Sequence, residues 1–183
     1  MKNTWRILGA VVALALAACT EENGGDGGGG GTTTGTCTGT FSGAITGTVR
    51  SCTVEATKFA NNNEIDFTIE ITPATGSGTL KSVDNLIITL TGDVKTGTFT
   101  GATLKNATGS VFSTDADKQY DVQLGFGGDI GTASLTLDAV PAPTNTGGNL
   151  NYQGFSGSTQ VKFDAPSTAD YTGSVNLSLT FKR

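Results

Sequence analysis

Apolar and polar residues alternate along most of the chain from residue 40 to the C-terminus. A period of two puts every second side chain on the same face of an extended strand, whereas an amphipathic helix repeats every 3.6 residues. The alternation therefore predicts strands with one face in the core, and no convincing helical stripe accompanies them. The clearest apolar sets are Ile65, Phe67, Ile69 and Ile71; Leu86, Ile88 and Leu90; Tyr120, Val122, Leu124 and Phe126; Ala133, Leu135, Leu137 and Ala139; and Tyr171, Gly173, Val175, Leu177, Leu179 and Phe181.

Weaker alternation predicts further strands, and turn residues such as Asn61-Asn62-Asn63 and Gly127-Gly128-Asp129 separate the segments. The 32 threonines suit the half-solvated surface of a sheet. Short strands at regular spacing predict an all-β fold, an antiparallel β-sandwich of roughly 9–10 strands, with a closed β-barrel as the alternative. We expect the last strand to lie well inside a sheet. The weaker strands are predicted at 40–48, 53–59, 97–104, 109–113, 150–154 and 158–164.

The N-terminal segment departs from this pattern. Lys2 and Arg6 come first, and an apolar run over 7–18 leads into Leu16-Ala17-Ala18-Cys19. A run of about 12 residues is too short for a ~30 Å hydrocarbon core, but it has the charge, length and small-residue end of an export signal. The stretch resembles a bacterial lipoprotein signal peptide, whose Leu-Ala-Ala-Cys lipobox directs acylation of the cysteine and cleavage before it. The alternatives are an ordinary signal peptide with a chance cysteine, or a buried helix.

The resemblance implies where the protein is held. Cys19 would be the first mature residue and would carry three acyl chains, palmitate among them, and two or more chains give stable membrane anchoring. Thr20 stands where diderm lipoproteins kept in the inner membrane carry Asp, so the resemblance implies the outer membrane of a Gram-negative bacterium. Whether the protein faces the periplasm or the cell surface stays open.

The chain then divides into three parts. Residues 1–18 are the predicted signal helix, and 19–36 hold the lipidated cysteine and a Gly- and Thr-rich linker. Without apolar side chains, this linker cannot offset the entropy lost on ordering, so we expect a flexible tether. Residues 37–183 are long enough for one domain with its own core.

Charge narrows the choice of partners. Loss of Lys2 and Arg6 leaves nine basic and 16 acidic residues, which is a net charge of −7 for the mature chain. Nucleic-acid binding requires clusters of Lys and Arg, so we expect no nucleic-acid partner. The lipid would attach the protein to the membrane, and the remaining partner would be an unknown protein or glycan.

The other two cysteines, Cys37 and Cys52, would be exported to an oxidising compartment, where a disulfide is expected. A straight strand over these residues would hold the two Cα atoms about 50 Å apart, but a disulfide needs roughly 4.4–6.8 Å. The chain between them must therefore bend or reverse, and Gly43 and Gly47 permit this.

The sequence offers little catalytic chemistry. It has no histidine, which removes Ser-His-Asp catalysis and the usual catalytic zinc site. Asp66 and Glu70 could pair as in glycoside hydrolases, but they alternate with apolar Phe67 and Ile69, so solvent exposure explains them better. We expect no catalytic residues, no enzyme activity and no obligatory cofactor.

Two weak ligand sites remain. Asp115 and Asp117, with Asp121 or Asp129 nearby, are candidate ligands for Ca²⁺, although a solvated turn explains the same residues. Tyr152 is a candidate sugar-stacking platform. The only tryptophan is Trp5, and we expect Tyr120 and Tyr171 on apolar strand faces.

These features predict a non-enzymatic, lipid-anchored envelope or cell-surface protein with a structural, adhesion or interaction role. The alternative is a glycan- or small-ligand-binding module of an envelope assembly.

The lipobox can be tested with Cys19→Ser. We expect this variant to leave the membrane fraction and to lose labelling by an alkynyl fatty acid, because the acylated thiol is gone. Thr20→Ser, which keeps the cysteine, should behave as the wild type. Persistent labelling of Cys19→Ser would refute the lipobox.

Overall fold

The computed structural model describes residues 36–115 and 118–182, and almost all regular structure in them is β-strand. A single 3₁₀ turn, η1 (Gly101–Thr103), precedes one strand. Within this part of the chain, no helix is long and apolar enough to cross a membrane. The strands are β1 (Thr36–Gly43), β2 (Gly47–Lys58), β3 (Glu64–Pro73), β4 (Leu80–Val83), β5 (Leu86–Thr91), β6 (Gly97–Thr100), β7 (Leu104–Ser113), β8 (Gln119–Leu124), β9 (Thr132–Ala139), β10 (Thr144–Thr146), β11 (Asn149–Gln153), β12 (Ser156–Asp164) and β13 (Ser174–Lys182).

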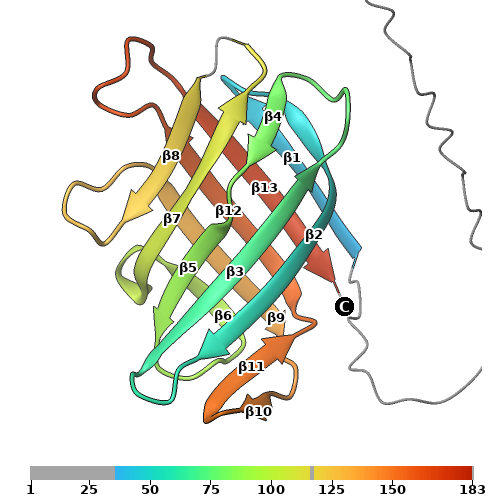
Figure 1. Ribbon diagram of the computed structural model, residues 1–183, viewed down its shortest axis with the longest axis vertical. Helices are drawn as coiled ribbons and strands as arrows, with labels where there is room; N and C mark the ends of the chain where they lie inside the picture. Colours follow the sequence, from blue (N-terminus) through green and yellow to red (C-terminus); the bar gives the residue numbers. More distant parts are fainter. Residues whose placement is uncertain (1–35, 116–117, 183) are drawn as a thin grey trace, which may run out of the picture. The chain divides into compact units, whose positions relative to one another are not determined.

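Antiparallel pairing joins eight of these strands in a ring (Figure 1). The order is β1-β13-β12-β8-β7-β5-β3-β2, and β2 pairs back to β1 through Thr40↔Thr48 and Phe41↔Gly47. The all-β antiparallel prediction is confirmed. Of the two predicted architectures, the chain adopts the alternative, a closed barrel, because this last pairing joins the two edges of the sheet. The final strand lies between β1 and β12, as expected.

The other strands extend the wall of the barrel. β4 continues the line of β5 along β7, and β11 with β10 adds a hairpin to β2. β12 pairs with β8 at Asp164↔Asp121 and with β9 over most of its length, and β6 pairs with the far side of β9. β1, β13, β12, β9 and β6 therefore form one continuous sheet across the back of the barrel in Figure 1.

Apolar side chains fill the interior, as the alternation predicts. The described hydrophobic residues of low exposure form one core cluster. Ile45, in the β1–β2 turn, and Phe155, in the β11–β12 turn, close opposite ends of it, and the Phe155 ring lies 5.3 Å from that of Phe67. The largest fully buried side chains are Phe67, Phe163, Ile45, Ile65, Ile69, Leu86, Ile88, Leu90, Leu135, Leu137, Leu177 and Leu179.

Three details of the predicted strands are wrong, and glycines explain two of them. Residues 40–48 form a hairpin, because the chain reverses between β1 and β2 after Gly43 (φ 103°). Phe126 is 56% exposed because β8 ends at Leu124, where Gly125 takes a φ of 84° that other residues rarely adopt. Tyr171 lies in the loop before β13, where its hydroxyl accepts a hydrogen bond from the Gln119 N–H and donates one to the Gln119 carbonyl.

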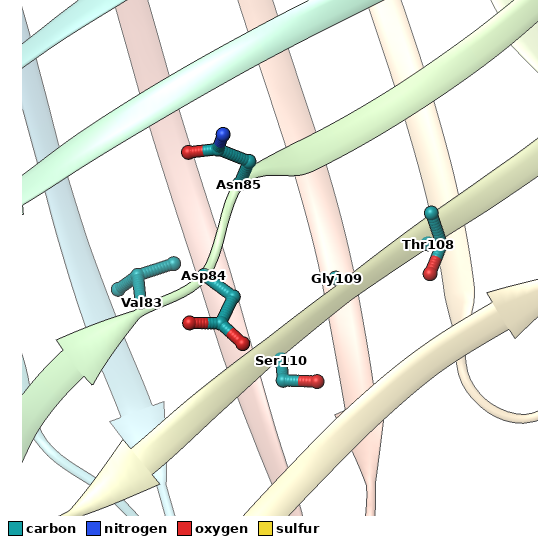
Figure 2. A pocket seen from close by; sticks show the side chains of 6 residues that line it. All are labelled: Val83, Asp84, Asn85, Thr108, Gly109 and Ser110. Atoms are coloured by element: carbon teal, nitrogen blue, oxygen red, sulfur yellow. The ribbon is translucent and has the colours of Figure 1, made fainter.

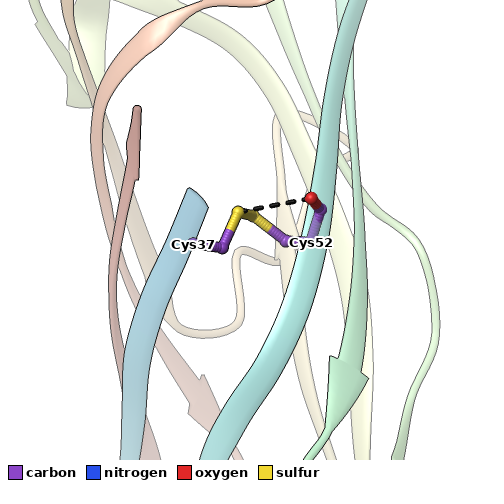
Figure 3. The surroundings of a disulfide bond; sticks show 2 residues. All are labelled: Cys37 and Cys52. Atoms are coloured by element: carbon purple, nitrogen blue, oxygen red, sulfur yellow. Dashed lines mark hydrogen bonds between the residues drawn. A yellow bond between two sulfur atoms is a disulfide. The ribbon is translucent and has the colours of Figure 1, made fainter. Parts of the chain in front are cut away.

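The predicted disulfide is confirmed. Cys37 on β1 and Cys52 on β2 are bonded, with their Cα atoms 5.6 Å apart (Figure 3). The Cys37 sulfur also lies 3.3 Å from the Cys52 carbonyl oxygen, and we regard this as a packing contact because an oxidised sulfur carries no proton. The expected chain reversal is the turn between Gly43 and Gly47.

Replacing both cysteines with alanine should lower the free energy of unfolding by about 3 kcal/mol, because the unfolded chain regains the entropy of the open loop. In a domain of this size, that corresponds to a fall in melting temperature of roughly 6–12 °C. Thermal unfolding followed by circular dichroism measures the change. An unchanged melting temperature would show that the disulfide contributes nothing to stability.

Candidate functional site

Because side chains fill the barrel, a binding site has to lie on its outer surface. One groove follows the break between β4 and β5, holds about 490 Å³ and is lined by Val83, Asp84, Asn85, Thr108, Gly109 and Ser110 (Figure 2). Val83 pairs with Val111 and Ile87 pairs with Thr108, so three residues between them face two on β7. This extra residue is a β-bulge, which bends the strand and opens the groove.

Glycine makes the bulge possible. A Cβ at position 109 would lie 3.3 Å from both the Cα and Cδ1 atoms of Leu86. Its absence lets the bulged chain pack closely against β7. Figure 2 shows the Asp84 side chain pointing toward β7, while that of Asn85 points away from it.

A polar network supports one side of the groove. The Asp84 N–H donates to the Ser110 carbonyl (2.9 Å), and the Ser110 hydroxyl donates to the Asp121 carboxylate (2.7 Å). The side-chain amide of Gln119 also donates to Asp121 (2.7 Å). The Asp84 carboxylate itself has no hydrogen bond or ion pair within the described residues. The groove therefore offers one carboxylate, one amide and two hydroxyls, which suit binding of a hydroxylated ligand better than catalysis.

Asp66 and Glu70 are not arranged as a catalytic pair. The Asp66 carboxylate is partly buried and accepts a hydrogen bond from the Thr89 hydroxyl (2.8 Å). Glu70 is exposed further along the same strand. Solvent exposure thus explains Glu70, whereas Asp66 binds a neighbouring strand.

The calcium prediction stays a prediction. Asp117 and the lipidation site Cys19 lie outside the described residues. Asp115 is exposed, Asp121 belongs to the network above, and Asp129 accepts the Gly125 N–H (2.9 Å) within its own turn. In the part of the chain that the structure describes, no three acidic, His or Cys side chains are grouped to hold a metal ion.

The predicted stacking platform is not available. Tyr152 is 8% exposed, and its ring packs 6.2 Å from that of Phe155. Its position opposite buried Ala56 turns the ring inward, so the expectation of an exposed Tyr152 was wrong. The exposed large hydrophobic residues of the described chain are Phe126 and Phe59 (38%). The alternation placed both within predicted strands, but β8 ends at Leu124 and β2 ends at Lys58, so neither ring is held in a strand.

A second hollow of about 490 Å³ lies beside β6, between the end of β5 and the start of β7. Phe99 and Leu104 contribute apolar surface to it, and Lys95 and Lys105 line it as well. Lys105 forms an ion pair with Glu64, so the charge of one of these two lysines is already paired.

An exposed ion pair joins Lys58 to Asp93, which lies two residues before Lys95 of this hollow. The Lys58 ammonium donates a hydrogen bond to the Asp93 carboxylate and attracts it, and both effects lower the pKa of Asp93 below its ordinary value. Lys95 lowers this pKa less. Because the pKa is depressed in the fold, the pair stabilises it above the ordinary pKa, and the contribution is lost as the pH falls through the lowered value.

No model of a protein family matches this chain, and no curated protein and no solved structure is significantly similar to it. A function for this chain is therefore inferred from its sequence and from the geometry of its surface.

The origin of the Asp93 shift can be tested by NMR titration. Lys58→Gln should raise the pKa of Asp93 toward its ordinary value, because it removes the hydrogen-bonded charge. Lys95→Gln should raise it less, since Lys95 acts by Coulombic attraction alone. A larger change in Lys95→Gln would contradict this order.

Proposed function

We propose that this chain is a non-enzymatic, lipid-anchored outer-membrane protein whose barrel serves as a rigid binding or structural domain of the bacterial envelope. The filled interior carries the proposal. A barrel with one continuous core leaves its recognition groups on the outer faces of the strands and in the loops.

The position of the chain ends fits an anchor. Thr36, where the described chain begins, pairs with Lys182 at the end of β13. Both ends of the described chain thus lie at one end of the barrel (Figure 1). The turns after β1, β3, β7 and β12 gather at the other end, where they would be free to meet a partner.

The contacts of the acidic residues support a non-catalytic role. General acid–base catalysis needs carboxyl groups placed to exchange protons with a substrate. Here seven of the described carboxylates accept hydrogen bonds or form ion pairs with neighbouring side chains or backbone. These pairs are Glu55 with Gln153, Glu64 with Lys105, Asp66 with Thr89, Asp93 with Lys58, Asp121 with Ser110, Asp129 with Gly125 and Asp164 with Lys162.

The groove at the β4–β5 break favours the second candidate, a module that binds a glycan or small ligand. Its free Asp84 carboxylate and the nearby amide and hydroxyl groups match sugar hydroxyls.

The proposal can be tested with lipidated protein purified from the outer membrane of a diderm host. We expect no turnover of chromogenic glycoside and ester substrates above that of a mock purification from cells lacking the gene, because no acid–base pair among the described residues faces a groove. Turnover that Asp66→Asn or Glu70→Gln abolishes would overturn the non-enzymatic role. Wild-type protein found in the soluble fraction would overturn the anchor.

A further inference from the structure

The outer face of β1, β13, β12, β9 and β6 carries two adjacent rows of uncharged polar side chains, which are serine and threonine except for Gln160. Strand register defines both rows. We call these ten residues the hydroxyl face. One row is Thr38, Thr180, Ser158, Thr136 and Thr98, and the other is Thr40, Ser178, Gln160, Ser134 and Thr100.

Charged side chains lie only at the borders of this face among the described residues of the five strands. Lys182 and Asp138 lie toward one end, and Lys162 with its ion-pair partner Asp164 lies toward the other. A soluble domain usually mixes both signs of charge over its surface. A charge-free area that spans five strands is therefore a departure that solubility does not explain.

Most side chains of the hydroxyl face on β1, β13 and β12 have no hydrogen-bond partner among the described residues. Thr98 and Thr136 bond to each other (3.1 Å), and the Ser134 hydroxyl donates to the Gln160 carbonyl (3.4 Å). The following side chains make no hydrogen bond to any described residue: Thr38, Thr40, Ser158, Gln160, Ser178 and Thr180.

The opposite wall of the barrel differs. On β2 and β3 the outward positions include Arg50, Glu55, Asp66 and Glu70. Some polar side chains there bond across strands, as in Thr57 to Asn151 (3.2 Å) and Gln153 to Glu55 (3.0 Å), while Thr53 and Thr72 make no side-chain hydrogen bond to a described residue. The threonine-rich composition is common to both walls, so composition alone does not explain why this face carries no charge.

A shallow depression of about 380 Å³ lies on this face. Ser134, Gln160 and Ser178 line it, and so do Asn176 and Lys162 in the next row. It is open along the sheet, so it suits part of a long ligand better than an enclosed small molecule.

We propose that the hydroxyl face binds a neutral polysaccharide, an inference that rests on the binding role proposed above. An ionic ligand would find no opposite charge on the two rows, and an apolar ligand would leave the hydroxyls without partners. A polyhydroxylated chain laid across the strands meets a donor and acceptor on each of them, at a spacing of about 4.7–4.9 Å. Without an exposed aromatic ring on the face, we expect weak binding, with a dissociation constant near 1 mM.

The test is affinity electrophoresis of the lipidated protein in detergent, in native gels that contain dextran, laminarin or alginate. We expect slower migration with a neutral glucan, dextran or laminarin, and none with acidic alginate. The triple variant Thr38→Val, Thr40→Val and Thr180→Val keeps the side-chain shape and removes three hydroxyls. It should weaken binding about tenfold or more, because each lost hydrogen bond removes part of the binding energy.

The matched control is Thr53→Val, Thr72→Val and Thr91→Val, which changes three exposed threonines on β2, β3 and β5 of the opposite wall. It should migrate as the wild type does. Should the first triple variant fail to fold by circular dichroism, Gln160→Ala with Ser178→Ala removes two partner-free groups with less change.

Several results would overturn the inference. These are no retardation in either neutral gel, retardation in alginate alone, or equal losses in the two triple variants. A dimer in analytical ultracentrifugation that Thr38→Val, Thr40→Val and Thr180→Val dissociates would show that a second copy covers the face. In all these cases the anchored, non-catalytic role would stand, because fractionation and turnover assays test it separately.

Discussion

The seam between β1 and β2 is the constraint on which this barrel depends. Hydrogen-bonded pairing joins the two strands near their turn, at Thr40↔Thr48 and Phe41↔Gly47. Further along, where β1 and β2 are no longer paired in register, the Cys37–Cys52 disulfide holds them. Gly39 lies between these two connections, and a Cβ there would come within 2.8 Å of Leu179 Cδ1. Ring closure thus depends on two backbone pairs, on the disulfide, and on a glycine at position 39, where a larger side chain would not fit.

Closure at this seam determines where recognition can take place. An open sandwich could bind a ligand along a sheet edge or between its sheets, but a ring of eight strands has no free edge of its own. Large apolar side chains then fill the enclosed space, with Ile45 and Phe155 at its two ends. The polar groups remain on the outside of the wall, which is why both candidate sites are surface features.

The two walls of the ring use their polar residues in different ways. On the side of β2, β3, β7 and β8, carboxylates and an amide accept hydrogen bonds from hydroxyls of neighbouring strands, and these contacts reinforce strand pairing. On the side of β1, β13 and β12, hydroxyls project from adjacent strands without such contacts. These hydroxyls on β1, β13 and β12 are therefore not used in hydrogen bonds between strands, which leaves them available to a ligand.

Local alternation determined much of this protein without any knowledge of its fold. The period of two identified the strands and placed Ile65, Phe67 and Ile69 in the core, because burial of one strand face depends on neighbouring residues alone. The number and spacing of cysteines likewise predicted the disulfide and the chain reversal. The missed ends of strands, at Phe126 and Tyr171, depended on glycine conformations and on a loop bonded to a distant strand.

Tertiary structure decided which strands, far apart in the sequence, pair with each other. Whether the last strands met the first and closed a barrel depended on strand order, which a single sequence does not encode in its periodicity. Pairing of β11 with β2 turned Tyr152 inward. Pairing of β1, β13, β12, β9 and β6 placed Thr38, Ser158 and Thr98, far apart in the chain, in one row. The sequence alone determined which strand faces are apolar and which are polar. Only the closed ring decided which of the polar residues stand side by side, because adjacency between strands is a property of register and closure.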